Sequence, residues 1–258
     1  MNAFALVHGS WMGSWAWDRV APILREAGHQ TTAVDLPGYG DDITPVAEPT
    51  LQACTDRALA AIDAASDPVI VARSMGGIVV STAAEQRPER VACAVYVAAY
   101  MLPNGESVFP FSQGNPGFAA SRVMGYLEID QAGGTSQIRP DGIGPVFVND
   151  GSAGDVVYAT ERVHVDYLAP SGTPIAITDA RSGWVRRLYV ETLPRPGGPG
   201  RRAAEDERAA SRCRRPLDRQ RAQPVPDAAS RVGRPARPRG RRRRNQGLNI
   251  HPDPGDRT

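Results

Sequence analysis

Ser74 is the residue whose type and surroundings most clearly suggest chemistry. It lies in the stretch V-I-V-A-R-S-M-G-G, where apolar β-forming residues run into a serine and two glycines follow. This pattern is a variant of the G-x-S-x-G nucleophile elbow, a sharp strand-to-helix turn that exposes a serine hydroxyl. The turn needs small residues two positions before and after the serine, here Ala72 and Gly76. The backbone N–H of Met75, at the start of the helix, would then point toward a developing oxyanion.

A second candidate group, His8-Gly9-Ser10-Trp11, follows the first apolar run of the chain. A backbone N–H just past such a His-Gly pair is where a nucleophile elbow finds its second oxyanion donor, so we expect the Ser10 N–H to face Ser74. The position of His8 suits shaping this loop through hydrogen bonds to the backbone better than acting as a base. The plainer alternative for Ser74 is that it only caps the helix that begins near Gly76.

The elements that must position these residues follow from hydrophobic periodicity and turn signals. Short apolar runs predict five strands, and amphipathic spacing predicts three helices between them; the strands are 4–7, 31–36, 69–72, 91–97 and 186–191, and the helices are 17–27, 51–65 and 76–86. This alternation predicts an α/β fold with a mostly parallel sheet and helices on both faces. Between 102 and 173 the rhythm is lost, which indicates an insertion over the sheet of the kind that often forms a lid.

Three stretches in this order resemble the α/β-hydrolase superfamily, closest to the small esterases grouped with plant methylesterases and hydroxynitrile lyases. They are V-H-G-S-W-M-G-S-W-A-W, A-G-H-Q-T-T-A-V-D-L-P-G-Y-G and R-S-M-G-G. The resemblance covers about residues 3–193 and implies an α/β-hydrolase core, 1–193, with a lid at about 102–173. It implies Ser74 as nucleophile and the backbone N–H groups of Ser10 and Met75 as oxyanion hole. The implied activity is hydrolysis of a small carboxylic ester through an acyl-enzyme, without a cofactor.

The chain departs from this family pattern beside the nucleophile and in the acid and base. Ala72 replaces the usual glycine, and Arg73 stands where the family usually has histidine. The family's triad follows in the order Ser, Asp, His, with the Asp after the last predicted strand in a pattern like R-D-R-x-x-P and the His further on in H-S-P-F. After Ser74 this chain has only His164, in the expected lid, and His251, and neither lies in that motif. The general base and acid are therefore unassigned.

A one-nucleotide frame offset would explain the missing acid and base. G+C-rich codons can be chosen for 193–199 that read R-D-R-A-V-P when one nucleotide is skipped at Pro194. With the same offset, codons chosen for 211–229 can read a strand followed by H-S-P-F. The Asp codon would straddle Arg195 and Pro196, and the His codon Ala222 and Gln223. Our hypothesis is that 194–258 is translated out of frame, so that the fold is incomplete at the C-terminus, apolar sheet is exposed and the chain is poorly soluble.

The composition of the tail agrees with this hypothesis. There is no lysine, 18 of the 30 basic residues lie between Pro194 and Thr258, and all 16 aromatic residues precede Pro194. We expect 194–258 to be disordered, because it has little with which to build a core. A nucleic-acid-binding arm at Arg241–Arg244 is the alternative for the basic run. We do not expect nucleic acid as a partner, since no aromatic residue is interleaved there.

The remaining expectations concern location, cofactors and function class. The three cysteines are odd in number and form no C-x-x-C pair, which favours free thiols and a reducing, cytoplasmic location. The N-terminal apolar run suits a strand better than a signal peptide, and no stretch is long and apolar enough to span a bilayer. No metal cluster or phosphate-binding glycine loop is visible, so we expect no cofactor. Two further functions stay open: a catalytically crippled relative that binds a small ligand, and an enzyme resembling hydroxynitrile lyases.

Overall fold

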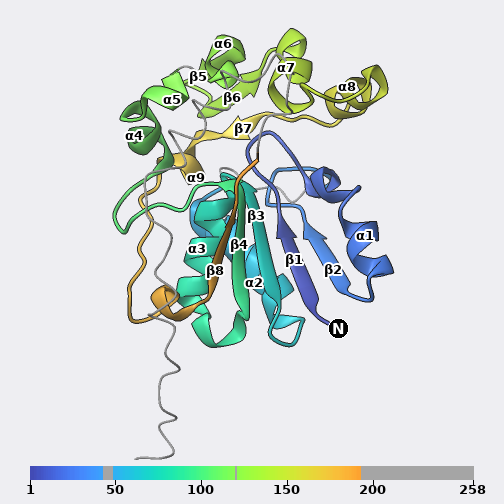
Figure 1. The fold of residues 1–258 in the computed structure, drawn as a ribbon. Coiled ribbons are helices and arrows are strands. Elements are labelled where there is room, and N and C mark those ends of the chain that lie inside the picture. The colour runs from blue at the N-terminus through green and yellow to red at the C-terminus, as the bar shows by residue number, and fades with distance from the viewer. Residues whose placement is uncertain (43–48, 120, 193–258) are drawn as a thin grey trace, which may run out of the picture. The chain divides into compact units, whose positions relative to one another are not determined.

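The structure is a computed structural model that describes residues 1–42, 49–119 and 121–192 (Figure 1). All of these residues belong to a compact unit, Met1–Ala222. The predicted tail, 194–258, lies outside the described residues, as do His251 and the proposed frame offset.

Within the described residues a parallel sheet of five strands has the order β2-β1-β3-β4-β8. The strands are β1 (Ala3–Val7), β2 (Gln30–Val34), β3 (Val69–Ser74), β4 (Cys93–Ala99) and β8 (Arg187–Val190). Near-continuous apolar runs are typical of strands that are covered on both faces. The five predicted strands and the parallel sheet are confirmed, with shifts of one or two residues at most of their ends.

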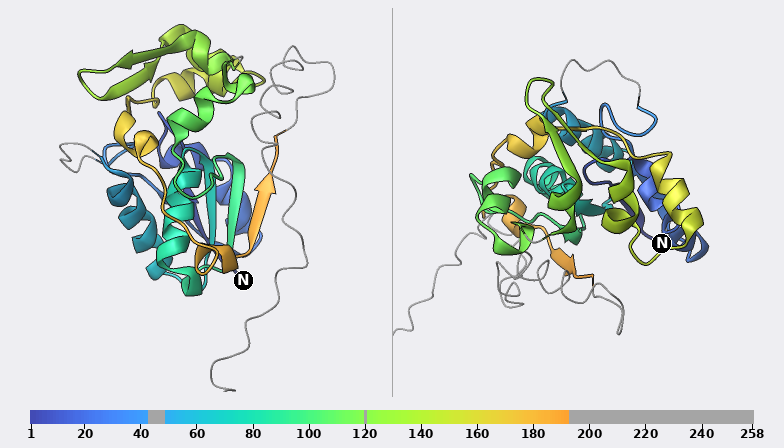
Figure 2. Two further views of the ribbon diagram at one scale, coloured as in Figure 1. Left: turned by 90° about the vertical axis from the view of Figure 1, so that its left-hand side faces the viewer. Right: turned by 90° about the horizontal axis from the view of Figure 1, so that it is seen from above.

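Helices lie on both faces of this sheet, as predicted (Figure 2). One face packs against α2 (Leu51–Asp63) and α3 (Gly76–Gln86), and the other against α1 (Ala21–Glu26). The bounds of α3 match the prediction. The expected helix 17–27 is shorter, because Pro22 has no N–H to donate and is tolerated only in the first helical turn. Short 3-10 helices precede α1 and β8 and follow α3, at Ser14–Trp17, Ser182–Trp184 and Pro88–Arg90.

The 102–173 segment lies beyond the carboxyl ends of the large strands (Figure 1). It holds a small antiparallel sheet, β5-β6-β7, and six short α-helices within the described ranges. The strands are β5 (Leu127–Asp130), β6 (Thr135–Ile138) and β7 (Asp166–Tyr167), and the helices are α4 (Val108–Gln113), α5 (Pro116–Ala119), α6 (Arg122–Tyr126), α7 (Ile143–Phe147), α8 (Ala153–Thr160) and α9 (Leu168–Gly172), with a 3-10 turn at Pro140–Gly142. Its own apolar cluster packs against Trp11 and Trp15 from the large sheet's first loop.

Candidate active site

Ser74 is the last residue of β3, and its backbone is in the left-handed region with φ 51°. Non-glycine residues rarely adopt this conformation, which costs on the order of 1–3 kcal/mol and persists only where the surroundings enforce it. Helix α3 begins two residues later at Gly76, so the chain reverses its course from strand to helix at the serine. The capping alternative is wrong, because Met75 is the N-cap and α3 has no side-chain cap hydrogen bond. The side chain of Ser74 is half-buried.

The glycines that follow Ser74 are needed for close backbone contact. A Cβ atom at Gly76 would overlap the carbonyl oxygen of His8, and one at Gly77 would overlap the carbonyl oxygen of Tyr100. The first turn of α3 therefore rests directly on the segments that follow β1 and β4. The pair of glycines thus seats the helix against two neighbouring strands as well as permitting the turn.

The loop after β1 lies against Ser74. A Cβ atom at Gly9 would come within 2.7 Å of the Ser74 Cβ and 3.3 Å of its Oγ. Ser10, the next residue, is buried, and Trp11 has a left-handed φ of 62°. The structure therefore places Gly9, the residue before Ser10, against the serine that Met75 follows in the chain.

His8 fixes the orientation of the Gly9–Ser10 peptide. The Leu36 N–H donates to His8 Nε2 over 3.1 Å, so the ring proton lies on Nδ1, which donates to the Gly9 carbonyl over 2.8 Å. In a trans peptide the carbonyl and the N–H point in opposite directions, so the Ser10 N–H points away from the His8 ring. His8 is completely buried, and this burial lowers its pKa to about 4. It is neutral at pH 7 and shapes the loop, as the sequence indicates.

Trp11 connects this loop to the 102–173 segment. Its indole N–H donates to the Ser136 hydroxyl over 3.2 Å, and its carbonyl accepts from the His164 N–H over 2.9 Å. Its ring centroid lies 6.0 Å from that of Phe147. The 102–173 segment therefore contacts the loop that lies next to Ser74.

Arg73 places a positive charge beside the candidate nucleophile. A guanidinium nitrogen lies 3.7 Å from the Met12 sulfur, and its carbon lies 5.9 Å from the centre of the Phe147 ring, a cation–π arrangement. The side chain thus extends from the nucleophile turn toward the 102–173 segment. A histidine there, as the family usually has, would carry no fixed charge.

The position of the site agrees with the topology of the sheet. From β1 the connection runs to β2 on one side, and β3 lies on its other side. In open α/β sheets ligands bind outside the carboxyl ends of the strands at such a switch point. Ser74 ends β3 and the 8–12 loop follows β1, so both stand at this point.

The described histidines do not supply a base bonded to Ser74. His29 lies at the other end of β1, where its Nδ1 accepts from the Asn2 N–H and its ring contacts Phe4. His164 has an exposed side chain. Asp35 is structural, as expected, since it accepts bonds from the Ser14 backbone and hydroxyl. Within the described ranges, no group of three or more His, Cys, Asp or Glu side chains could hold a metal.

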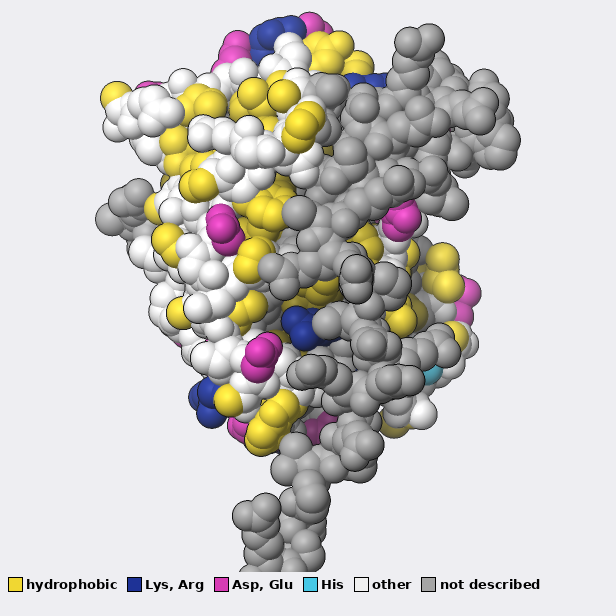
Figure 3. Space-filling model, turned by 60° about the vertical axis from the view of Figure 1, so that its left-hand side comes forward, with side chains coloured by type: hydrophobic (Ala, Val, Ile, Leu, Met, Phe, Trp, Pro, Cys, Tyr) yellow, Lys and Arg dark blue, Asp and Glu magenta, His cyan; other side chains and the backbone are white. Residues whose placement is uncertain are grey.

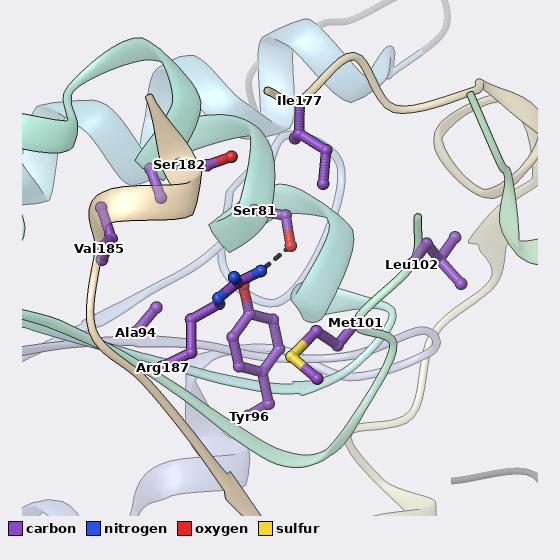
Figure 4. A pocket seen from close by; sticks show the side chains of 10 residues that line it. Ser81, Ala94, Tyr96, Met101, Leu102, Ile177, Ser182, Val185 and Arg187 are labelled. Carbon is purple, nitrogen blue, oxygen red and sulfur yellow. Dashed lines mark hydrogen bonds between the residues drawn. The ribbon is translucent and has the colours of Figure 1, made fainter. Parts of the chain in front are cut away.

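The small pocket in Figure 4 lies away from this site, between α3, β4 and β8. Hydroxyls of Ser81 and Tyr96 meet there at 2.9 Å, beside Arg187. Neither Ser74 nor any residue of the 8–12 loop lines it. We therefore leave it outside the candidate active site.

Two other findings concern the described residues alone. No helix among them is long and apolar enough to cross a membrane. Cys54 is buried and Cys93 is partly buried, and both are free thiols, as predicted for them.

The profile of the alpha/beta hydrolase family matches residues 4–246. The chain belongs to this family. This agrees with the elbow at Ser74, the order of the strands and the resemblance drawn from the sequence.

Curated relatives and a solved structure point in the same direction. Putative methylesterase 11, chloroplastic, of Arabidopsis thaliana is 30% identical over 202 residues, 74% of this chain, and the chain spans about half, 52%, of that protein's length. Salicylic acid-binding protein 2 of Nicotiana tabacum is 28% identical over 210 residues, which are 76% of this chain and 80% of that protein. The crystal structure of polyneuridine aldehyde esterase matches with a TM-score of 0.62 and 24% identity, over 73% of this chain and 79% of that one, and supports the fold.

Asp166 and Tyr39 were not predicted as site residues from the sequence, although both contact the loop beside Ser74. The Tyr39 hydroxyl donates to the Asp166 carboxylate over 2.7 Å, and both side chains are buried. A single aspartate in V-H-V-D-Y carries no motif. Only the packing of the 102–173 segment reveals the contact.

Proposed function

We propose that the protein is a serine hydrolase that acts on a small carboxylic ester, with Ser74 as its nucleophile. The observation that carries this proposal is the left-handed backbone of Ser74 at the β3–α3 turn, in contact with Gly9. The names of the relatives, methylesterase 11 and polyneuridine aldehyde esterase among them, support ester hydrolysis.

In the proposed reaction the Ser74 Oγ attacks the ester carbonyl carbon, and its proton passes to a base. The carbonyl oxygen becomes an oxyanion, which accepts hydrogen bonds from the Ser10 and Met75 N–H groups. Each such donor is worth on the order of 3 kcal/mol of transition-state stabilisation. The bond to the alcohol oxygen then breaks, and the alcohol leaves with the proton from the base. Water hydrolyses the acyl-serine, releasing the acid and restoring the hydroxyl.

We propose that the base and its carboxylate partner belong to the frame-restored sequence that begins after Leu193. The support is indirect, since the described histidines are committed elsewhere or exposed: His8 is bonded at both ring nitrogens, and His29 lies at the far end of β1. Without base and acid the chain as written becomes a poor catalyst that can still bind a small ligand, with losses on the order of a million-fold in a comparable triad.

The test compares hydrolysis of p-nitrophenyl acetate and butyrate by the chain as written and by a frame-restored version. We expect turnover by the restored chain and little by the other. S74A should abolish turnover, while S66A, an exposed serine on the α2–β3 connection, should leave it unchanged. Equal turnover by both chains would refute the frame assignment, and H164A would then identify whether His164 serves as base. Turnover that survives S74A would refute the whole proposal.

A further inference from the structure

A buried carboxylate joins the 102–173 segment to the loop beside Ser74. Asp166, the first residue of β7, is 3% exposed. It accepts hydrogen bonds from the Tyr39 hydroxyl, the Ser10 side chain and the Trp11 backbone N–H. None of the ion pairs among the described residues includes it. Burying a carboxylate that is held only by neutral donors costs free energy.

The three donors come from two loops at the carboxyl ends of the large strands. Ser10 and Trp11 follow β1, and Tyr39 follows β2. Tyr39 is itself fixed, since its hydroxyl accepts from the Tyr167 N–H over 3.2 Å and its ring stacks edge-on against Tyr167 at 5.7 Å. The carboxylate therefore meets a rigid partner on one side and the loop beside Ser74 on the other.

The same loop is held from the opposite side by His8. His8 Nδ1–H bonds the Gly9 carbonyl, whereas Asp166 bonds the Trp11 N–H and the Ser10 side chain. Two successive peptides are thus fixed from two sides. Trp11 needs such support, because its left-handed φ of 62° is unfavourable for a large side chain.

We propose that Asp166 is a positioning residue. When β7 is packed against the loop after β1, the Asp166 carboxylate holds this loop so that the Ser10 N–H stays beside Ser74. The proposal rests on the proposed function, because it assigns the Ser10 N–H to the oxyanion. The position of the Ser10 N–H would then depend on the 102–173 segment through the Asp166 side chain.

We call the hold of Asp166 on the Ser10 side chain and the Trp11 N–H the clamp. The clamp should weaken in acid. Burial raises the pKa of Asp166 to about 6, and below this the carboxyl must use one oxygen as a donor and can accept fewer bonds. The titratable neighbours stay protonated over the same range: burial raises the pKa of Tyr39 well above its usual value and that of Cys54 to about 12. His8 changes charge only near pH 4.

Amide hydrogen exchange on the full chain tests the clamp without requiring activity. In D166N we expect peptides covering 9–17 to exchange at least tenfold faster than in the unmodified chain at pH 7, with the ratio falling toward one at pH 5. D141N, an exposed carboxylate paired with Arg139 in the same segment, is the matched control and should change neither. H164N should keep the pH dependence. An unchanged 9–17 exchange in D166N at both pH values would overturn the proposal.

The positioning role is measured in the frame-restored chain, which we expect to be active, as the first release of p-nitrophenolate from p-nitrophenyl acetate when Ser74 is acylated; D166N, S10A and S74A are made in that chain for this assay. D166N should slow the first-order acylation constant about tenfold and leave the substrate concentration at half-saturation unchanged. Faster exchange with unaltered acylation would mean a purely structural contact and would overturn the proposal. If D166N does not fold, S10A removes one donor to the carboxylate and should raise exchange in the same peptides. If acylation is no faster than in S74A, the proposed function fails, whereas exchange still decides whether Asp166 holds the loop.

Discussion

The turn at Ser74 and the sheet edge at β8 differ in how completely the described residues cover them. Around Ser74 the interior is closed: Met75, Ile78 and Val79 are at most 1% exposed. At the other region, Leu188 and Val190 of β8 are 45% and 39% exposed. Hydrophobic side chains reach the surface on the side of the molecule drawn in Figure 3.

The open region is one face of the sheet and not the whole edge. Leu188 stands opposite Val95, and Val190 stands opposite Val97. Val95 and Val97 lie at the margin of the apolar cluster beneath α1. They are only partly buried. On the other face, Ala94 and Tyr96 are buried beneath α3.

This difference separates the proposed site into two parts. The proposed nucleophile, Ser74, and the proposed oxyanion donors lie in the closed region, in the loop after β1 and the turn after β3, two neighbouring strands of the sheet. The acid and base of the family pattern were expected after β8, where apolar cover also ends. One missing in-frame segment would account for both.

The largest expected effect is on the open face. The frame-restored chain should unfold with a free energy higher by on the order of 4 kcal/mol than the chain as written, because its final strand and helix would bury the aliphatic pairs on β4 and β8. Urea denaturation followed by circular dichroism measures this, with a chain ending at Thr192 as control. Equal free energies of unfolding for all three chains would contradict this prediction, because burying this face of β4 and β8 would then add no stability.

The sequence predicted the closed region around Ser74 well. It predicted the 102–173 segment and the contact of that segment with the loop after β1 poorly. The strands and α3 follow from unbroken apolar runs and from the two glycines after Ser74, which are local signals. The three-stranded sheet of the 102–173 segment was missed, because T-S-Q-I and D-Y carry little strand pattern. The clamp at Asp166 was missed because its partners, Ser10 and Tyr39, are distant in sequence and meet it only through tertiary packing.

The second prediction concerns the pH dependence of the closed region. Native His8 resists a proton until about pH 4 while the unfolded residue binds it near 6.5, so His8 lowers stability as the pH falls. Asp166 acts in the opposite sense: the native carboxyl binds a proton near pH 6 and the unfolded one near 3.8, so its contribution is full at low pH and is lost as the pH rises through 6. The two nearly cancel in the unmodified chain.

D166N should remove the Asp166 contribution and leave that of His8 uncompensated. Relative to the unmodified chain, its free energy of unfolding should fall by up to about 3 kcal/mol between pH 6.5 and 4. Urea midpoints across this range, taken as the difference between the two proteins, remove the titrations they share. D141N serves as the control, because an exposed carboxylate should not reproduce this fall. Parallel pH profiles for D166N and the unmodified chain would contradict the pKa of about 6.

The third prediction tests the backbone packing of the closed region. G77A should destabilise the protein by about 2–3 kcal/mol, since the added methyl group would overlap the backbone carbonyl of Tyr100, which cannot move without shifting β4's end. G125A is the matched control, because nothing lies within 4 Å of the added carbon and alanine favours the helix α6. The measurement is thermal unfolding of both variants. If G125A destabilised the protein as much as G77A, the overlap with the Tyr100 carbonyl could not be the reason for the effect of G77A.

The smallest expected effects compare one isosteric change in the two regions. V79T places a hydroxyl at a fully buried position of α3, next to the Ser74 turn, and should cost about 2 kcal/mol because a buried hydroxyl loses its water. V190T makes the same change on β8, where the side chain is 39% exposed and the hydroxyl keeps its water, and should cost less than about 0.5 kcal/mol. Urea denaturation of both variants in the chain as written measures the contrast. Repeating V190T in the frame-restored chain sharpens it, since the cost there should rise toward that of V79T if the restored segment covers β8. A cost for V190T that is the same in both chains would mean that this face stays open in the restored protein.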